Sequence, residues 1–212
     1  MNEQTGADDP VVFVIDDDPS VRSALDSLIR SVALNVRSFA TADDFLRERK
    51  HDGPGCIVLD VRLPGRSGLD FQQDLIRSDI RLPVIFITGH GDVPMSVRAI
   101  KAGAIEFLTK PFRDQDLLDA IQTGIERDRQ QRKLKEFTAR LRSRFDALTS
   151  REREIMRQVV SGRPNKQIAA HLKLSEFTVK VHRSHVMQKM KAKSLAELVR
   201  MADSLSADIG KA

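Results

Sequence analysis

Short apolar runs alternate with amphipathic stretches over the first 125 residues of the chain. The runs are rich in Val, Ile, Leu and Phe, which favour strands, and the stretches between them repeat apolar residues at helical spacing. We expect strands at 11–15, 36–39, 56–59, 84–87 and 106–108, and helices at 19–32, 43–49, 70–80, 93–101 and from 112 onward. This alternation predicts an α/β fold with a doubly wound, five-stranded parallel sheet and helices on both faces.

The last third of the chain shows only helical patterns. We expect helices at 150–160, 165–172, 176–191 and 195–205. Ser175 and Ser194 are suited to cap the last two, while Gly162 and Pro164 separate the first two. The short connection at 173–175 is typical of a helix-turn-helix. The sequence therefore predicts a second, smaller, all-α helix-turn-helix domain.

The segment between the two parts is charged and lacks Gly and Pro from 126 to 144. Apolar residues recur in and after it at spacings of three and four: Leu134, Phe137, Leu141, Phe145 and Leu148. This spacing favours a helical linker, and a disordered tether is the alternative because 128–133 contains no apolar residue. We expect a disordered tail at 1–9, an α/β domain at 10–127, a helical linker at 128–146, a helix-turn-helix domain at 147–206 and a tail at 207–212.

Charge differs sharply between the two parts. Residues 1–128 hold 15 Lys and Arg against 22 Asp and Glu, a net charge of −7, whereas residues 129–212 hold 20 against 8, a net charge of +12. The basic part suggests a polyanionic partner, and a merely solvated charged face is the alternative. The chain has one cysteine, no signal-peptide pattern and no apolar run near the roughly 20 residues that span a bilayer. We therefore expect a cytoplasmic protein without a membrane partner.

Polar residues follow four of the expected strands. Asp16 and Asp17 follow the first, Asp60 the third, Thr88 the fourth and Lys110 the fifth. Because the carboxyl ends of parallel strands meet at one edge of a sheet, we expect these groups to converge. Carboxylates bind Mg²⁺, an aspartate can accept a phosphoryl group, and Lys can pair with phosphoryl oxygens. The pattern predicts a phosphoryl site, although acidic residues after strands also serve as ordinary turn residues.

Four segments resemble two-component response regulators of the FixJ/NarL type. They are Val-Ile-Asp-Asp-Asp-Pro-Ser-Val-Arg at 14–22, Leu-Asp-Val-Arg-Leu-Pro-Gly-Arg-Ser-Gly at 59–68, Ile-Thr-Gly-His-Gly-Asp-Val-Pro-Met at 87–95 and Lys-Ala-Gly-Ala-Ile-Glu-Phe-Leu-Thr-Lys-Pro-Phe at 101–112. The resemblance covers essentially the whole chain. It implies a flavodoxin-like receiver domain and phosphorylation by a sensor histidine kinase.

The resemblance also implies a role for each residue of the phosphoryl site. Asp60 would be the phosphoacceptor. The implied ligands of Mg²⁺ are Asp16, Asp17, Asp60 and the carbonyl of Arg62. Thr88 would be the switch hydroxyl and Lys110 the phosphate-binding lysine, and the Lys110–Pro111 bond is often cis in such proteins. Phe107 would be a switch aromatic that turns inward, and an ordinary core Phe is the alternative.

The expected helix at 176–191 has two contrasting faces. One face carries Val179, Val186 and Met190, and the opposite face carries Lys180, Val181, Ser184 and Gln188. A mixture of polar and small apolar groups suits the major groove of DNA, where polar groups read base edges and apolar ones contact thymine methyls. An ordinary amphipathic surface helix would show the same pattern.

Three further segments resemble the LuxR-type helix-turn-helix. They are Leu-Thr-Ser-Arg-Glu-Arg-Glu at 148–154, Pro-Asn-Lys-Gln-Ile-Ala at 164–169 and Thr-Val-Lys-Val-His-Arg at 178–183. The resemblance implies base contacts from Lys180, Val181 and Ser184. It implies phosphate contacts from Asn165, Lys166, Thr178, His182, His185 and Lys189. The implied partners are double-stranded DNA and, on phosphorylation, a second copy of the chain, with RNA polymerase as a further candidate.

Pattern and resemblance together predict a phosphorylation-controlled transcription regulator, whose only chemistry of its own is slow autodephosphorylation. The enzymatic alternative is a haloacid-dehalogenase-like phosphohydrolase, which also uses an Asp nucleophile. Such enzymes carry a second acid two residues further on, where this chain has Arg62. Another alternative makes the α/β domain a dimerisation module that works without phosphorylation. The opposite charges of the two parts also suggest that the receiver masks the DNA-binding surface before activation.

Overall fold

The computed structural model describes residues 9–48, 53–89 and 91–209, with side chains up to Leu205. The chain forms two compact units, residues 1–132 and residues 133–212. Of the tails expected at 1–9 and 207–212, residues 1–8 and 210–212 lie outside the described residues, whereas 207–209 form the end of the last helix, Leu195–Ile209. Among the helices that the structure describes, none combines the length and the apolar character needed to cross a membrane.

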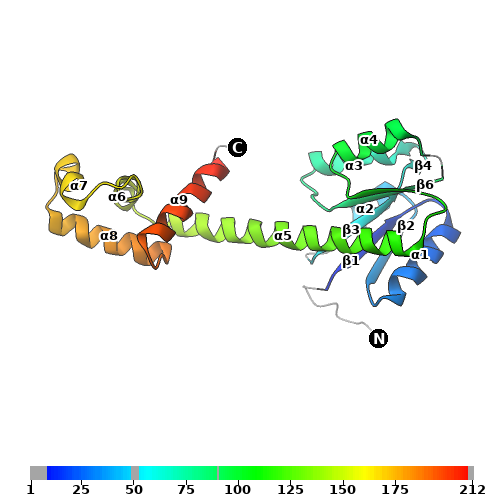
Figure 1. The fold of residues 1–212 in the computed structure, drawn as a ribbon, viewed down its shortest axis with the longest axis horizontal. Coiled ribbons are helices and arrows are strands. Elements are labelled where there is room, and N and C mark those ends of the chain that lie inside the picture. Colours follow the sequence, from blue (N-terminus) through cyan, green and yellow to red (C-terminus); the bar gives the residue numbers. More distant parts are fainter. Residues whose placement is uncertain (1–8, 49–52, 90, 210–212) are drawn as a thin grey trace. The chain divides into compact units, whose positions relative to one another are not determined.

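The N-terminal unit is built on a parallel sheet flanked by helices (Figure 1). The sheet has five strands in the order β2-β1-β3-β6-β7. The strands are β1 (Val11–Ile15), β2 (Asn35–Phe39), β3 (Gly55–Asp60), β6 (Val84–Thr88) and β7 (Glu106–Thr109). β1, β3 and β6 are buried along their whole length, because helices cover both sides of the sheet. The predicted α/β fold is confirmed, and its strand order places β1 beside β3 at the point where the direction of winding reverses.

Helices cover the two faces of this sheet in two groups (Figure 1). They are α1 (Pro19–Ser31), α2 (Ala42–Glu48), α3 (Gly68–Arg77), α4 (Val93–Lys101) and α5 (Asp114–Asp146). Strand residues such as Phe13 and Leu59 form one core with α2, α3 and α4. Their neighbours in sequence, such as Val12 and Val58, form the other core with α1 and α5. The alternation of side chains along each strand thus divides the apolar residues between two cores.

The loop after β3 folds into a small hairpin that the sequence did not predict. β4 (Arg62–Leu63) pairs antiparallel with β5 (Arg66–Ser67) around Gly65, whose φ is +74°. A Cβ atom at Gly68 would clash with the backbone carbonyl oxygen of Asp60, so only glycine allows this loop to close against β3. Strands of two residues are too short to show an apolar periodicity, which is why the hairpin left no signal.

Helix α3 begins and ends earlier than predicted. The side chain of Ser67 accepts a hydrogen bond from the amide of Leu69, so the helix begins at Gly68 rather than at residue 70. The chain leaves the helix after Arg77, yet Ile80 is buried. An apolar residue at helical spacing therefore extended the expected helix beyond its end.

Helix α5 continues through the segment at 128–146. Asp128 is buried near its middle and accepts hydrogen bonds from the amide of Gly55 (3.0 Å) and from Nε of Arg132 (2.7 Å). A buried carboxylate needs such partners, and here they join α5 to the start of β3. The N-terminal unit accordingly extends to Arg132, five residues beyond the boundary expected at 127.

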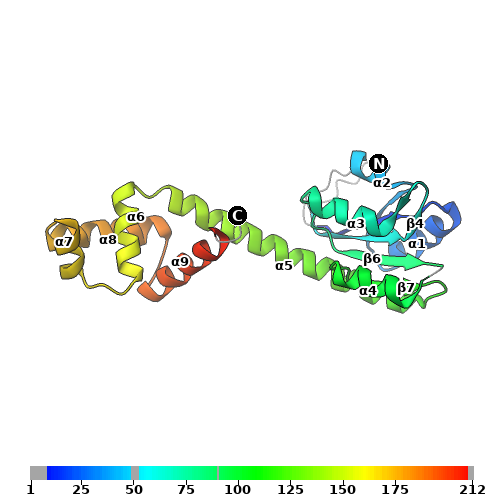
Figure 2. The same ribbon diagram turned by 90° about the horizontal axis from the view of Figure 1, so that it is seen from above.

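The C-terminal unit packs its helices around an apolar core of its own (Figure 2). After α5 come α6 (Ser150–Val160), α7 (Asn165–Leu172), α8 (Glu176–Met190) and α9 (Leu195–Ile209). Lys173, with a φ of +54°, ends α7, and the Ser175 side chain caps α8 by accepting from the amide of Thr178 at 3.0 Å. The predicted cap at Ser175 is confirmed, and α7 and α8 form a helix-turn-helix.

Candidate functional site

Lys110, which follows β7, lies close to the ends of both β1 and β3. Its Nζ atom is 2.8 Å from Oδ2 of Asp16 and 3.5 Å from Oδ1 of Asp60. Asp16 is 1% exposed and Asp60 is 7% exposed, so both carboxyl groups are largely withdrawn from water. The Lys110–Pro111 peptide bond is cis. Three of the residues expected to converge thus meet in the crevice outside β1 and β3.

Asp16, Asp17 and Asp18 have three different environments. Asp16 is buried and its Oδ1 accepts from the amide of Asp18 at 2.9 Å, whereas Asp17 is exposed. Asp18 caps α1, since its side chain accepts from the amide of Ser20 at 2.7 Å. Arg22 of α1 donates to the backbone carbonyls of Asp16 and Asp17 at 2.7 and 2.8 Å. These hydrogen bonds were not predicted from the sequence, although an Asp directly before a Pro at a helix start is a recognisable cap signal.

The charges in this crevice fit a divalent cation. Burial raises the pKa of Asp60, the ammonium of Lys110 lowers it, and the neighbouring Asp16 raises it again, so the pKa lies above its ordinary value. The amide of Arg62 donates to Oδ2 of Asp60 at 3.1 Å. Two buried carboxyl groups, those of Asp16 and Asp60, thus face one ammonium, and Asp17 lies next to them in sequence with an exposed side chain. Such an excess of oxygen ligands and negative charge suits a hard cation such as Mg²⁺.

Thr88 and Phe107 both border the loop that follows β6. Thr88 is 1% exposed, and its backbone carbonyl accepts from the amide of Lys110 at 2.7 Å. Phe107 is half-buried with its ring 6.2 Å from that of Phe86. A Cβ atom at Gly91 would lie 2.8 Å from Phe107 and 3.2 Å from Thr88, which shows how closely this loop packs on both side chains.

Helix α8 exposes the residues expected to contact bases. Lys180 and Ser184 are exposed and Val181 is 37% exposed. Val179 and Val186 on the other side of the helix are buried in the core of the C-terminal unit. The helix therefore has the two contrasting faces that its sequence predicted.

The residues expected to contact DNA phosphates lie at the starts of α7 and α8 and further along α8. Lys166 is exposed in the first turn of α7. The neighbouring Asn165 accepts from Nη1 of Arg183 at 3.0 Å, so its side chain is held against α8. Oγ1 of Thr178 lies 2.8 Å from Oγ of Ser175 in the first turn of α8.

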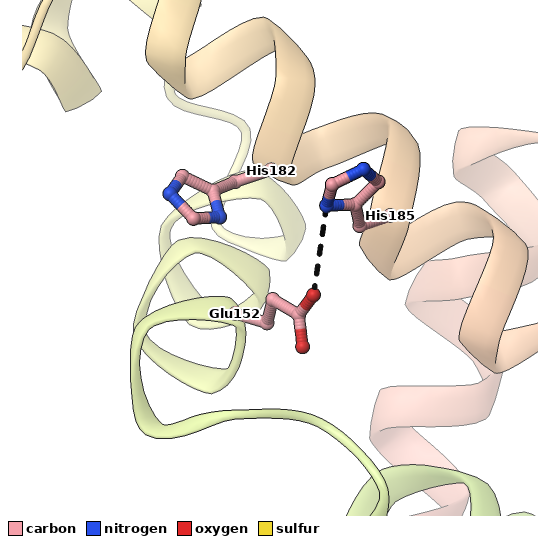
Figure 3. Close-up of side chains that lie close together, drawn as sticks. All are labelled: Glu152, His182 and His185. Atoms are coloured by element: carbon pink, nitrogen blue, oxygen red, sulfur yellow. Dashed lines mark ion pairs between the residues drawn. The ribbon is translucent and has the colours of Figure 1, made fainter.

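The remaining candidates, His182, His185 and Lys189, lie around Glu152 of α6. Ligand atoms of Glu152, His182 and His185 are within 4.8 Å of one another, which is close enough for a shared metal ion (Figure 3). However, Nζ of Lys189 is 2.7 Å from Oε2 of Glu152, and the amide of Thr149 donates to the same oxygen at 2.8 Å. A metal ion would face this ammonium directly. We therefore interpret Glu152 as an acceptor that ties α8 to the start of α6.

The hydrogen bonds of Glu152 also affect its ionisation. Burial raises the pKa of Glu152, but the hydrogen bonds from Lys189 and Thr149 together outweigh burial and hold the pKa below its ordinary value. Thr149 and Glu152 form a capping box at the start of α6. The spacing Thr-x-x-Glu is a known sequence signal for a capping box, so the capping box of α6 could have been predicted from the sequence.

A parallel sheet with an acidic crevice, followed by a helix-turn-helix unit, defines the class of DNA-binding response regulators. The family model described as "Response regulator receiver domain" matches residues 12–122. The family model described as "Bacterial regulatory proteins, luxR family" matches residues 146–202. The chain therefore belongs to the response regulators with a receiver domain and a LuxR-type DNA-binding domain, which are transcription factors of two-component systems and not enzymes.

Known proteins resemble the chain over most of its length. Nodulation protein W of Bradyrhizobium diazoefficiens is 53% identical over 92% of this chain and 86% of its own. The transcriptional regulatory protein FixJ of Azorhizobium caulinodans is 44% identical over 90% of both chains. The solved structure of the response regulator StyR is 47% identical, covers 92% of this chain and 98% of its own, and has a TM-score of 0.84.

Proposed function

We propose that Asp60 is the phosphoacceptor of this response regulator and that a sensor histidine kinase supplies the phosphoryl group. The observation that carries the proposal is the position of Lys110, whose ammonium lies within 3.5 Å of Asp60 and 2.8 Å of Asp16. Phosphorylation then leads to dimerisation and to regulated binding of DNA. Because its target is chromosomal DNA, we place the protein in the cytoplasm.

The chemistry requires a nucleophile, a cation-binding pair and a phosphate anchor. An oxygen of Asp60 attacks the phosphorus atom, and an oxygen–phosphorus bond forms while the donor leaves with the electron pair of its own bond to phosphorus. Mg²⁺, bound by Asp16, Asp17, Asp60 and the Arg62 carbonyl, would neutralise charge on the phosphoryl oxygens. Lys110 exchanges its contact with Asp60 for one with a phosphoryl oxygen, as its flexible side chain permits.

We propose that Thr88 and Phe107 transmit the effect of phosphorylation from the site to the surface of the receiver domain. The Thr88 hydroxyl would bind a phosphoryl oxygen, and Phe107 would fill the space that Thr88 leaves. The nearby helix α4 exposes apolar side chains, with Val93 75%, Val97 44% and Ile100 46% exposed. Exposed apolar residues grouped on one helix support a surface that is covered when two copies dimerise.

Helix α8 is proposed to enter the major groove. Lys180, Val181 and Ser184 would contact bases, because all three are exposed on one face. Phosphates would be bound by the flanking residues Asn165, Lys166, Thr178, His182, His185 and Lys189. Lys189 is paired with Glu152, so we expect it to contribute less to DNA affinity than the exposed Lys166 does.

The site is tested by labelling with radioactive acetyl phosphate in the presence of Mg²⁺. Asp60→Asn should abolish labelling while the circular dichroism spectrum stays unchanged, because the amide has the same shape but cannot accept the phosphoryl group. The matched control is Asp79→Asn, an exposed acidic residue outside the crevice, which should label like the wild type. Undiminished labelling of Asp60→Asn would refute the assignment.

A further inference from the structure

Phe177, at the start of α8, has an aromatic side chain that is exposed to solvent. It is 75% exposed, although burial of an apolar side chain is favourable. In the described part of the C-terminal unit from α6 onward, the other large apolar side chains that stand out from the surface are Val181 at 37% and Leu195 at 40%. Two of these three residues, Phe177 and Val181, are thus one helical turn apart on the same helix.

Phe177 also shares a face with the residues proposed to contact bases. Phe177, Lys180, Val181 and Ser184 are spaced i, i+3, i+4 and i+7 along α8, so their side chains lie in one stripe. The buried residues Val179, Val186 and Met190 face the other way and anchor the helix to its core. Phe177 is the most N-terminal member of the stripe, and the N-terminal residues of a recognition helix are those that reach base edges.

We infer that Phe177 determines sequence preference by packing against the C5-methyl group of a thymine in the major groove. A phenyl ring has no hydrogen-bond donor or acceptor at its edge, so it cannot read polar groups, but it can cover a methyl group. Cytosine lacks this methyl group, and the contact would therefore favour thymine at one position of each half-site. The inference rests on the proposed recognition surface of α8 and adds a base contact to it.

The proposed contact can be tested by removing one thymine methyl group at a time. The acetyl-phosphate-treated full chain would first select its site from duplexes with roughly 20 random base pairs, enough for two half-sites. Each thymine of the selected duplex is then replaced by deoxyuracil, which removes only the methyl group. For the wild type we expect one position per half-site at which deoxyuracil weakens binding about fourfold, the factor for burying one methyl-sized group.

Phe177→Ala should bind the thymine duplex about as weakly as the wild type binds the deoxyuracil duplex, and it should no longer distinguish the two. Leu195→Ala removes another exposed apolar side chain, from α9, and should keep the full sensitivity to deoxyuracil. Circular dichroism checks that both variants retain their helices. The inference is overturned if the wild type shows no sensitive thymine, or if Phe177→Ala keeps the wild-type sensitivity.

Lys180→Ala distinguishes a failure of this inference from a failure of the proposed recognition surface on which it rests. If Lys180→Ala relaxes base preference while Phe177→Ala changes nothing, the recognition surface stands and the role of Phe177 is refuted. If neither variant alters binding, the proposed surface itself is wrong. A Phe177→Ala protein that binds DNA normally but fails to regulate transcription would show that Phe177 meets a protein partner, which also refutes the thymine contact.

Discussion

Lys110 and the carboxyl groups of Asp16 and Asp60 illustrate how single residues set the chemistry of this protein. Burial raises the pKa of Asp60, the ammonium of Lys110 lowers it only in part, and the neighbouring Asp16 raises it further. In the proposed site, the exposed Asp17 would supply a further oxygen ligand for Mg²⁺. At the residue scale the site is therefore prepared for a cation and a phosphoryl group rather than for a stable ion pair.

Asp17→Ala tests the cation part of this arrangement. The variant should fold normally, because Asp17 is exposed, but bind Mg²⁺ on the order of tenfold more weakly, since one ligand is lost. Isothermal titration of Mg²⁺ into the full chain measures this directly. Asp9→Ala, an exposed acid before β1, is the control and should leave the Mg²⁺ affinity unchanged; equal affinities for all three proteins would remove Asp17 from the site.

Glu152→Gln tests the link between α6 and α8. Near neutral pH we expect the variant to lose about 1–3 kcal/mol of unfolding free energy, because the amide cannot pair with the ammonium of Lys189. The folded-state pKa of Glu152 lies below its ordinary value of 4.5, so its contribution is complete above that pH and is lost as the pH falls through the folded pKa. Urea unfolding should therefore show that the difference in unfolding free energy between the variant and the wild type decreases in acid. A difference that stays constant down to about pH 3 would contradict this account.

At the scale of the element, the cap of α8 positions the start of the proposed recognition helix. Ser175→Ala removes the hydrogen bond to the amide of Thr178 and should cost about 1 kcal/mol of unfolding free energy. Ser184→Ala is the matched control, because Ser184 is exposed within the same helix and alanine favours helices. Equal stability of the two variants in urea titrations would show that the cap does not stabilise α8.

The elements that carry the clearest apolar patterns were also those predicted best from the sequence. The fully buried strands β1, β3 and β6 were recognisable as short continuous apolar runs, and the helix α6 by its helical spacing of apolar residues. Asp128 was assigned to a linker since its partner, the amide of Gly55, is distant in sequence. The convergence of Asp16, Asp60 and Lys110 could be predicted from the topology of the sheet. The hydrogen bonds that Arg22 donates to nearby backbone carbonyls could not, because such bonds leave no pattern in the sequence.

At the scale of the whole molecule, the proposed function requires that a phosphoryl group on Asp60 change the affinity of α8 for DNA. It can shift the protein between two states only through interactions that differ between them. Thr88 and Phe107 are suited to create that difference, because both pack against the loop after β6. Thr88→Ala should therefore still be labelled on Asp60 but lose most of the phosphorylation-driven dimerisation and DNA affinity, whereas Ser96→Ala, which removes only a half-buried hydroxyl from α4, should behave like wild type.

The central claim is that phosphorylation of Asp60 controls DNA binding through this route. The most direct measurement is a DNA titration with parallel sedimentation of wild type, Asp60→Asn and Thr88→Ala, each with and without acetyl phosphate and Mg²⁺. The account predicts that acetyl phosphate raises the DNA affinity and the dimer fraction of the wild type only. If Asp60→Asn responded as the wild type does, or if labelled wild type bound DNA no better than unlabelled, the account would be contradicted.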